Sequence, residues 1–215
     1  MIEFLGGLFI ASFSITFITF FFLKEEGLLI EGILLFVPER HEEGLKHVMQ
    51  SIRRLLRRYF IGVIIQTLLI TFLVTLGFSI IGVGFNHAVI IGIVSGLLNI
   101  IPYVGPLIGA FFGMLVGLIV YLQVPVGLTF LSFMLSITLI YAIVQTTDNI
   151  VFQPMIFSNS VKAHPLEIFI VILASGYLAG IVGMFLAIPV YTILRVLARE
   201  FFYNYRLVQK ITGRL

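Results

Sequence analysis

One short stretch decides how the rest of this chain is interpreted: Asn99-Ile100-Ile101-Pro102-Tyr103-Val104-Gly105-Pro106. It stands within a run of sequence between Arg58 and Asp148 that contains no Asp, Glu, Lys or Arg. A membrane-spanning helix needs only about 20 apolar residues, so this run must form several segments that fold back on one another inside a bilayer. A polar break at that depth is costly, because its backbone needs hydrogen-bond partners without water. Proteins tolerate such breaks mainly where they line a cavity or a substrate site, which favours a transporter or a pore-like protein.

Composition gives the class of protein. The 215 residues are 60% hydrophobic and 11% charged, whereas soluble domains are about 25% charged. We therefore predict an all-α polytopic integral membrane protein. Cysteine is absent, which rules out disulfides and cysteine-ligated metal sites. A net charge of +3 is too small to indicate nucleic acid. No phosphate-binding glycine loop and no nucleophile–base pattern is present, so we expect neither an enzyme nor a tightly bound cofactor.

The positive charges predict the topology. Seven of the 13 Lys and Arg residues lie between Lys24 and Arg58, and five lie between Arg195 and Arg214. Basic residues beside spans mark the cytoplasmic side, so we expect both regions to face the cytosol. The predicted location is the inner or plasma membrane. The predicted parts are a first span at 1–23, retained rather than cleaved, a cytosolic or interfacial helical region at 24–58, a transmembrane core at 59–197 with breaks at 99–106 and 175–180, and a basic cytosolic tail at 198–215.

The region after Pro38 predicts an amphipathic helix. Its apolar residues fall at helical spacing on one stripe: Leu45, Val48, Met49, Ile52, Leu55, Leu56 and Tyr59. Glutamates begin the segment and arginines end it, which complements the helix dipole. We interpret it as a helix lying on the membrane surface or on the protein's own cytosolic face. A regulatory or gating element is the alternative.

The core predicts a repeated pattern of a full span followed by a broken pair. The span 61–81 precedes the break at 99–106, and the span 126–145 precedes the break at 175–180. Five to seven membrane segments result. Because both flanking basic regions are cytosolic, the crossings between them must be even in number. If each broken pair returns to its own side, the two halves are inverted repeats, as in many transporters with discontinuous helices.

The break at 99–106 is the first candidate site. Pro102 and Pro106 each remove a backbone donor, so we expect unpaired carbonyls about one turn earlier that could bind a cation, water or a polar solute. Gly105 permits close backbone approach, and Asn99 offers both donors and an acceptor. The alternative is a proline-shaped turn between short helices that Asn99 merely caps.

Asp148 is the second candidate, because it is the only acidic residue between Glu43 and Glu167. Ionisable residues near membrane depth are functional-site hypotheses. Its carboxylate could bind Na⁺ or carry a proton, with Gln145 and Asn149 as neutral ligands. The alternative is an aspartate exposed to water at the interface. Gln66 and Gln145 lie inside apolar spans, where an interhelical hydrogen bond is favoured over ligand binding. Gly176, Gly180 and Gly183 form a small-residue face for gating or packing.

Four blocks of the sequence resemble the AI-2E (autoinducer-2 exporter) family of bacterial and archaeal membrane proteins. They are the segment 97–106, Arg58-Tyr59-Phe60-Ile61-Gly62, Asp148-Asn149 with Pro154, and His164-Pro165-Leu166 followed by Gly176, Gly180, Gly183, Ala187 and Pro189. The resemblance covers roughly residues 8–197 and implies an oligomeric multi-span inner-membrane transporter. Members are associated with autoinducer-2 export or with Na⁺/H⁺ antiport. They usually carry two further spans and a longer soluble region ahead of the part that matches 4–23.

The expected function is a secondary transporter or exporter of a small polar signal molecule or an ion. The pathway would include Asn99, Pro102, Tyr103, Gly105 and Pro106, and Asp148–Asn149 with Gln145 would be a coupling or gate site. A Na⁺/H⁺ antiporter, an oligomeric ion-conducting pore and a structural scaffold are the alternatives. The expected partners are the lipid bilayer, a small polar solute or monovalent cation, and further copies of the chain, with Na⁺ or H⁺ as the coupling ion.

Overall fold

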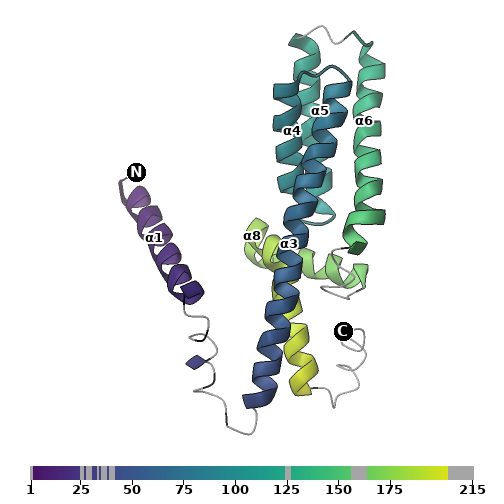
Figure 1. Cartoon of the computed structure of the whole chain (residues 1–215). Helices are drawn as coiled ribbons and strands as arrows, with labels where there is room; N and C mark the ends of the chain where they lie inside the picture. The colour runs from purple at the N-terminus through teal and green to yellow at the C-terminus, as the bar shows by residue number, and fades with distance from the viewer. Residues whose placement is uncertain are drawn as a thin grey trace. The chain divides into compact units, whose positions relative to one another are not determined.

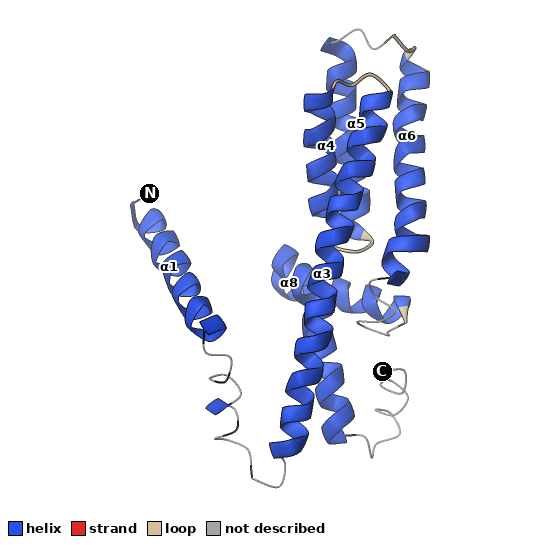
Figure 2. Ribbon diagram, viewed as in Figure 1, coloured by secondary structure: helices blue, strands red, loops and turns tan. Residues whose placement is uncertain are grey.

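The computed structural model describes residues 2–24, 27, 31–32, 34, 38, 42–123, 127–155 and 164–202 (Figure 1). Over these residues the regular structure is helical and contains no strand (Figure 2). Four of the described helices are long and apolar enough to cross a membrane. The all-α polytopic class is therefore confirmed, and the chain is a multi-pass membrane protein. The chain divides into two compact units, 1–51 and 52–215.

The first unit contains helix α1, Ile2–Lys24, which includes most of the predicted first span. Its 23 residues extend about 35 Å at 1.5 Å per residue. Phe9, Phe13, Phe17 and Phe21 recur every fourth residue and stack along one face, with neighbouring ring centroids 6.5, 5.8 and 4.7 Å apart. Part of the predicted region 24–58 lies outside the described residues, which are continuous from Glu42 to Gln123.

Helix α3, Glu42–Ile80, is one continuous helix of 39 residues. The sequence predicted two elements here, an amphipathic helix and then a span at 61–81, but no proline or turn separates them. Glu42 and Glu43 lie in the first turn, and Glu42 pairs with Lys46 at 3.5 Å. Four members of the predicted stripe are buried, namely Leu45, Val48, Ile52 and Tyr59. The polar and apolar parts of α3 therefore belong to a single helix.

The second half of α3 forms an antiparallel bundle with α4, Phe85–Leu98, α5, Val104–Gln123, and α6, Phe130–Thr147 (Figure 1). Thr75 Oγ1 donates to the Ala88 carbonyl at 3.4 Å, which places α4 beside α3. The rings of Phe78 and Tyr141 lie 5.8 Å apart, which places α6 beside it too. The shared core contains Ile70, Val74, Phe78, Val83, Ala88, Ile91, Val120, Phe133, Ile137 and Val144.

Small residues allow these helices to approach closely, as is common in membrane bundles. Every fourth residue of α5 on one face is a buried glycine: Gly105, Gly109, Gly113 and Gly117. A Cβ atom at Gly113 would strike the Tyr141 ring of α6. On α4, a Cβ atom at Gly92 would lie 2.6 Å from the Thr71 carbonyl oxygen of α3. The four-residue spacing of the α5 glycines is visible in the sequence and is a signal of close helix packing that the sequence analysis does not use.

Helix α8, Pro165–Phe202, is a hairpin rather than a straight span. Ala179 and Gly180 have non-helical backbone angles, and Gly180 has a φ of 60°. Tyr191 Oη donates to Glu167 Oε2 at 2.9 Å, although 24 residues of straight helix would separate them by about 36 Å. The kink coincides with the predicted break at 175–180.

Two glycines of the predicted small-residue face, Gly176 and Gly183, lie inside this hairpin, whereas Gly180 is exposed at its turn with no atom within 4 Å of an added Cβ. A Cβ atom at Gly183 would lie 2.9 Å from the Ala179 Cβ, and one at Gly176 would press on the Met184 side chain. Both predicted broken pairs thus fold back on themselves, as the inverted-repeat hypothesis requires. Symmetry between the two halves stays a prediction.

Candidate functional site

The turn between α4 and α5 satisfies its own backbone. The Ile101 N–H donates to the Leu98 carbonyl at 3.1 Å, and the Val104 N–H donates to the Pro102 carbonyl at 2.8 Å. These are the carbonyls that lie four residues before Pro102 and Pro106. The prediction that they are left unpaired is wrong, because the chain tightens into short turn hydrogen bonds there. Each of these two carbonyls therefore already accepts one hydrogen bond.

Two residues shape the turn. Tyr103 has a φ of 66°, a left-handed conformation that is uncommon for a residue with a side chain. Its ring packs edge-on against Phe169 of α8, with centroids 5.6 Å apart. Gly105 lies so close to the Leu98 carbonyl that a Cβ atom would collide with it. The break therefore faces protein: Ile100, Ile101 and Tyr103 pack on a cluster that joins α3 and α8.

Asp148 is fully buried, with 0% of its surface exposed. The alternative of an interfacial aspartate exposed to water is therefore wrong. Gln66 Nε2 of α3 donates to Asp148 Oδ1 at 2.6 Å. Gln153 Nε2 donates to Oδ2 at 2.9 Å, and Asn99 Nδ2 lies at the long distance of 3.5 Å from the same oxygen. The two candidate sites, the break and the acid, thus meet in one place.

A change in helix type explains how Gln153 reaches Asp148. Residues Asp148–Phe152 form a π-helical turn, η2, and the Gln153 N–H donates to the Asp148 carbonyl five residues back. In an α-helix the residue stacked over Asp148 would be Phe152 instead. The π-turn therefore puts an amide over the carboxylate. Such turns occur frequently at functional sites.

The predicted neutral ligands Gln145 and Asn149 lie one step away from the acid. Gln145 Nε2 donates to Asn149 Oδ1 at 3.1 Å, and Gln153 Nε2 also reaches that oxygen at 2.9 Å. The direct partners Gln66 and Gln153 were not among the predicted site residues. The signal for Gln66 was an amide alone in an apolar span. Its expected use, an interhelical hydrogen bond, agrees with the structure, and its partner is the acid.

The donors around Asp148 are all neutral amides. Within the described ranges, no Lys, Arg or His pairs with this carboxylate. Over the same residues, no group of three or more His, Asp or Glu side chains could hold a metal ion. A buried carboxylate is very costly as an isolated charge, and proteins neutralise it with a proton or a cation. The arrangement is thus suited to a single exchangeable positive charge.

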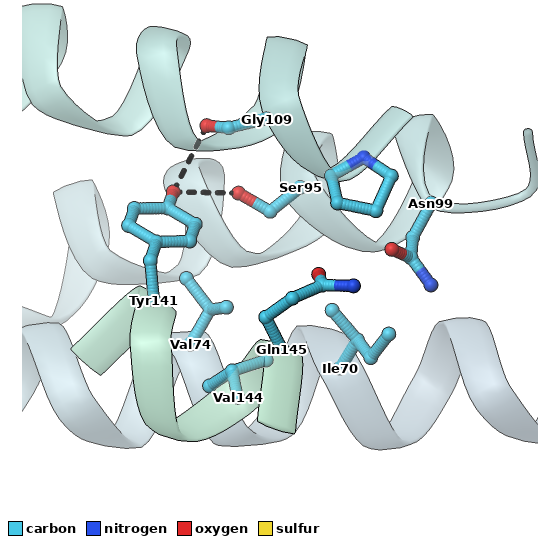
Figure 3. A pocket seen from close by; sticks show the side chains of 9 residues that line it. Ile70, Val74, Ser95, Asn99, Gly109, Tyr141, Val144 and Gln145 are labelled. Carbon is cyan, nitrogen blue, oxygen red and sulfur yellow. Dashed lines mark hydrogen bonds between the residues drawn. The ribbon is translucent and has the colours of Figure 1, made fainter. Parts of the chain in front are cut away.

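A small cavity lies beside Asn99 among the four bundle helices (Figure 3). The volume open to the centre of a water molecule in this cavity is about 10 Å³. Tyr141 crosses one end, where its hydroxyl lies 2.8 Å from Ser95 Oγ and donates to the Gly109 carbonyl at 3.0 Å. The Asn99 and Gln145 amides lie at the other end (Figure 3). Pro106 also lines the cavity, as do the apolar side chains of Ile70, Val74 and Val144.

Comparison with known proteins agrees with this architecture. The model of the AI-2E family transporter matches residues 1–202. The chain is 28% identical over 197 residues to "Putative transport protein YrrI" of Bacillus subtilis, covering 90% of this chain and 52% of that protein. It is 31% identical over 176 residues to "Putative permease PerM" of Escherichia coli K12, covering 82% and 47%.

The chain thus spans about half the length of the curated relatives it matches. No solved structure is significantly similar to it. The match over nearly all of its length, together with the motifs at the turn and at Asp148, decides the family. The chain belongs to the AI-2E family of transporters.

Proposed function

We propose that this chain forms the ion-coupling core of a secondary transporter, in which Asp148 binds the coupling cation, H⁺ or Na⁺. The observation that carries the proposal is the complete burial of Asp148 among neutral amides. Removal of a carboxylate from water is costly, and amide hydrogen bonds offset only part of that cost, so binding of a proton or cation is favoured there. Binding and release of one positive charge is the chemistry that ion coupling needs. The solute moved is a small polar molecule or an ion.

The depth of the site supports this role. Gln66 lies eight residues beyond Arg58 on α3, which is about 12 Å along the helix axis. If Arg58 lies at the lipid phosphates, the carboxylate lies well inside the hydrocarbon, where ionisable residues mark ion or substrate pathways. By the positive-inside rule this end of the bundle lies on the cytosolic side of the inner membrane. Cations would then reach Asp148 from the cytosolic side.

A narrower version is Na⁺/H⁺ antiport, in which the two ions compete for the same carboxylate. The ligands favour monovalent ions, since one carboxylate and several amide oxygens provide a single negative charge. Gln66, Asn99 and Gln153 present nitrogen to Asp148 when they donate to it. Rotation of an amide would present oxygen to a bound Na⁺ instead. Proton binding at the carboxylate needs fewer such rotations.

The test is ion flux in proteoliposomes made with the wild-type chain and with Asp148→Asn. An imposed pH gradient is followed with an entrapped dye, with and without Na⁺ outside. The matched control is Glu43→Gln, which neutralises an exposed acidic residue on α3. We expect flux in the wild type and the control, and none in Asp148→Asn at equal protein content.

Wild-type flux in Asp148→Asn would overturn the proposal. Steady current in a planar bilayer without an opposing gradient would favour the oligomeric pore instead. A chain that folds and inserts but shows no flux for any ion would favour a scaffold, or a core that needs the further segments present in its longer relatives. Cross-linking in the same liposomes would test the expected homo-oligomer.

A further inference from the structure

The hydroxyl groups beside the cavity have a fixed hydrogen-bond direction. Tyr141 has a single hydroxyl hydrogen, which it donates to the Gly109 carbonyl at 3.0 Å. The hydrogen in the contact between Ser95 and Tyr141, at 2.8 Å, must therefore come from Ser95. This leaves the Ser95 oxygen with lone pairs and without a hydrogen to give. Toward the cavity, Ser95 is an acceptor.

The two amides at the other end are also directed. The Asn99 nitrogen faces Asp148 at 3.5 Å, and the Gln145 nitrogen donates to Asn149 at 3.1 Å. The oxygen of each amide diverges from its nitrogen, and both oxygens lie on the cavity side in Figure 3. Besides the Tyr141 hydroxyl and the Gly109 carbonyl, which bond to each other, the polar part of the wall offers three acceptors: Ser95 Oγ, Asn99 Oδ1 and Gln145 Oε1. Its remaining side chains are largely apolar.

A wall of acceptors needs a donor of the right size. The available space of about 10 Å³ is close to the least that one water molecule requires, and a buried water typically makes two to four hydrogen bonds. We propose that the cavity binds a single water molecule, which donates its two hydrogens to these oxygens. The wall carries no charged group, because Asp148 does not line it. A neutral donor therefore fits better than a metal cation.

This water has a consequence for the ion site, and that consequence rests on the proposed function. A donor at the Asn99 oxygen holds the amide with its nitrogen toward Asp148. Without the donor, the amide can rotate and turn its oxygen toward the carboxylate, which replaces an attraction by a repulsion. Ser95 and Tyr141 do not touch Asp148, yet through the water they position one of its partners. They are positioning residues for the ion site.

The water itself is tested by solid-state NMR of the chain in lipid bilayers. Magnetisation is transferred from water to isotope-labelled glycine, and the signals of Gly109 and Gly117 are compared. Both are buried glycines of the α5 stripe, but Gly109 lines the cavity while Gly117 faces Ile137 and the Phe78 and Phe133 rings. We expect transfer to Gly109 and none to Gly117. Equal absence at both positions, or a Gly109 signal that Na⁺ abolishes, would overturn the proposal.

The positioning role is tested by flux kinetics of Ser95→Ala and Tyr141→Phe. Matched controls are Ser136→Ala on the exposed face of α6 and Tyr121→Phe, whose exposed hydroxyl donates to the Leu128 carbonyl. We expect the ion concentration for half-maximal flux to fall roughly tenfold in the two cavity variants, because the free carboxylate loses one hydrogen-bond donor and the cation-bound form does not need it. The maximal rate and the controls should change little.

The outcomes separate this inference from the function it rests on. If Asp148→Asn abolishes flux while both cavity variants behave like their controls, the positioning role is wrong and the proposed function stands. If Asp148→Asn keeps wild-type flux, the proposed function fails and the positioning role fails with it. The NMR comparison decides the water site in either case. Thermal unfolding of each variant shows whether a loss of flux merely reflects a loss of fold.

Discussion

The two halves of the helix bundle differ in what fills their core. From Tyr141 to Asp148 the interior holds hydroxyls, amides and a carboxylate. On the other side of Tyr141 the buried side chains are apolar, among them Phe78, Ile91 and Phe133, each with 0% exposure. The same four helices build both halves, so helix packing alone does not make a site. The site depends on the polar side chains at one end of the bundle.

The difference assigns separate tasks to the two ends. In a bilayer, apolar helices gain little from leaving lipid, so close packing rather than water exclusion holds the apolar half together. Substitutions in the apolar half should alter stability, and those in the polar half should alter ion binding.

The largest effect is expected when a charge is placed in the apolar half. Ile137→Asp buries a carboxylate without a donor, which should destabilise the bundle by several kcal/mol or prevent its folding. Ile137→Leu conserves volume and should cost less than about 1.5 kcal/mol. Thermal unfolding in detergent compares the two. Equal midpoints would mean that this half is not dry, and the contrast between the halves would be lost.

Next in size is the loss of the shortest hydrogen bond to the acid. Gln66→Leu removes the donor at 2.6 Å from Asp148. A hydrogen bond to a charged group contributes about 1.5–3 kcal/mol, so loss of this donor to the free carboxylate should raise the affinity for the cation by at least about tenfold. Gln50→Leu, at an exposed position of the same helix, is the control. Unchanged half-saturation in Gln66→Leu would show that this amide only joins two helices.

A smaller effect is expected at the boundary between the halves. Gly113→Ala places a methyl group against the Tyr141 hydroxyl and ring, and such overpacking costs about 1–3 kcal/mol. Tyr141→Phe removes the nearest atom of that contact. The double variant should therefore be more stable than the sum of the single changes predicts. Strict additivity in the unfolding free energies would contradict the close contact between α5 and α6.

The smallest effect is expected one turn earlier. At Gly109 an added Cβ atom would meet Ser95 at 3.4 Å or more, which is ordinary contact. Gly109→Ala should therefore leave stability unchanged or raise it by up to about 1 kcal/mol. The pair of alanine variants at Gly109 and Gly113 can be measured in one unfolding series. A larger loss of stability in Gly109→Ala than in Gly113→Ala would mean that the closest helix contact of α5 is at Gly109 rather than at Gly113.

The sequence predicted much of this from simple physics. The uncharged run between Arg58 and Asp148 required a membrane bundle, and the prolines at 102 and 106 located its turn. The glycines near 180 located the kink of α8. The continuity of α3 is not predicted, because the change from polar to apolar composition suggests a boundary although no proline interrupts the helix there.

The site was predicted only in parts. Asn99 and Asp148 were each identified, but their meeting depends on the antiparallel pairing of α4 and α6 with α3, and that pairing is tertiary. Burial of Asp148 was not foreseen for the same reason, since a residue at the end of a span can face either water or protein. The role of Gln153 depends on the π-turn, which has no reliable pattern in a single sequence.

The most direct measurement is an infrared difference spectrum of the chain in lipid bilayers, recorded on changing pH and on adding Na⁺. The account predicts a carboxyl band in the wild type that changes with the ion and is missing in Asp148→Asn, while Glu43→Gln retains it. Identical ion-dependent spectra in the wild type and Asp148→Asn would show that Asp148 binds no exchangeable cation, and would contradict the central claim.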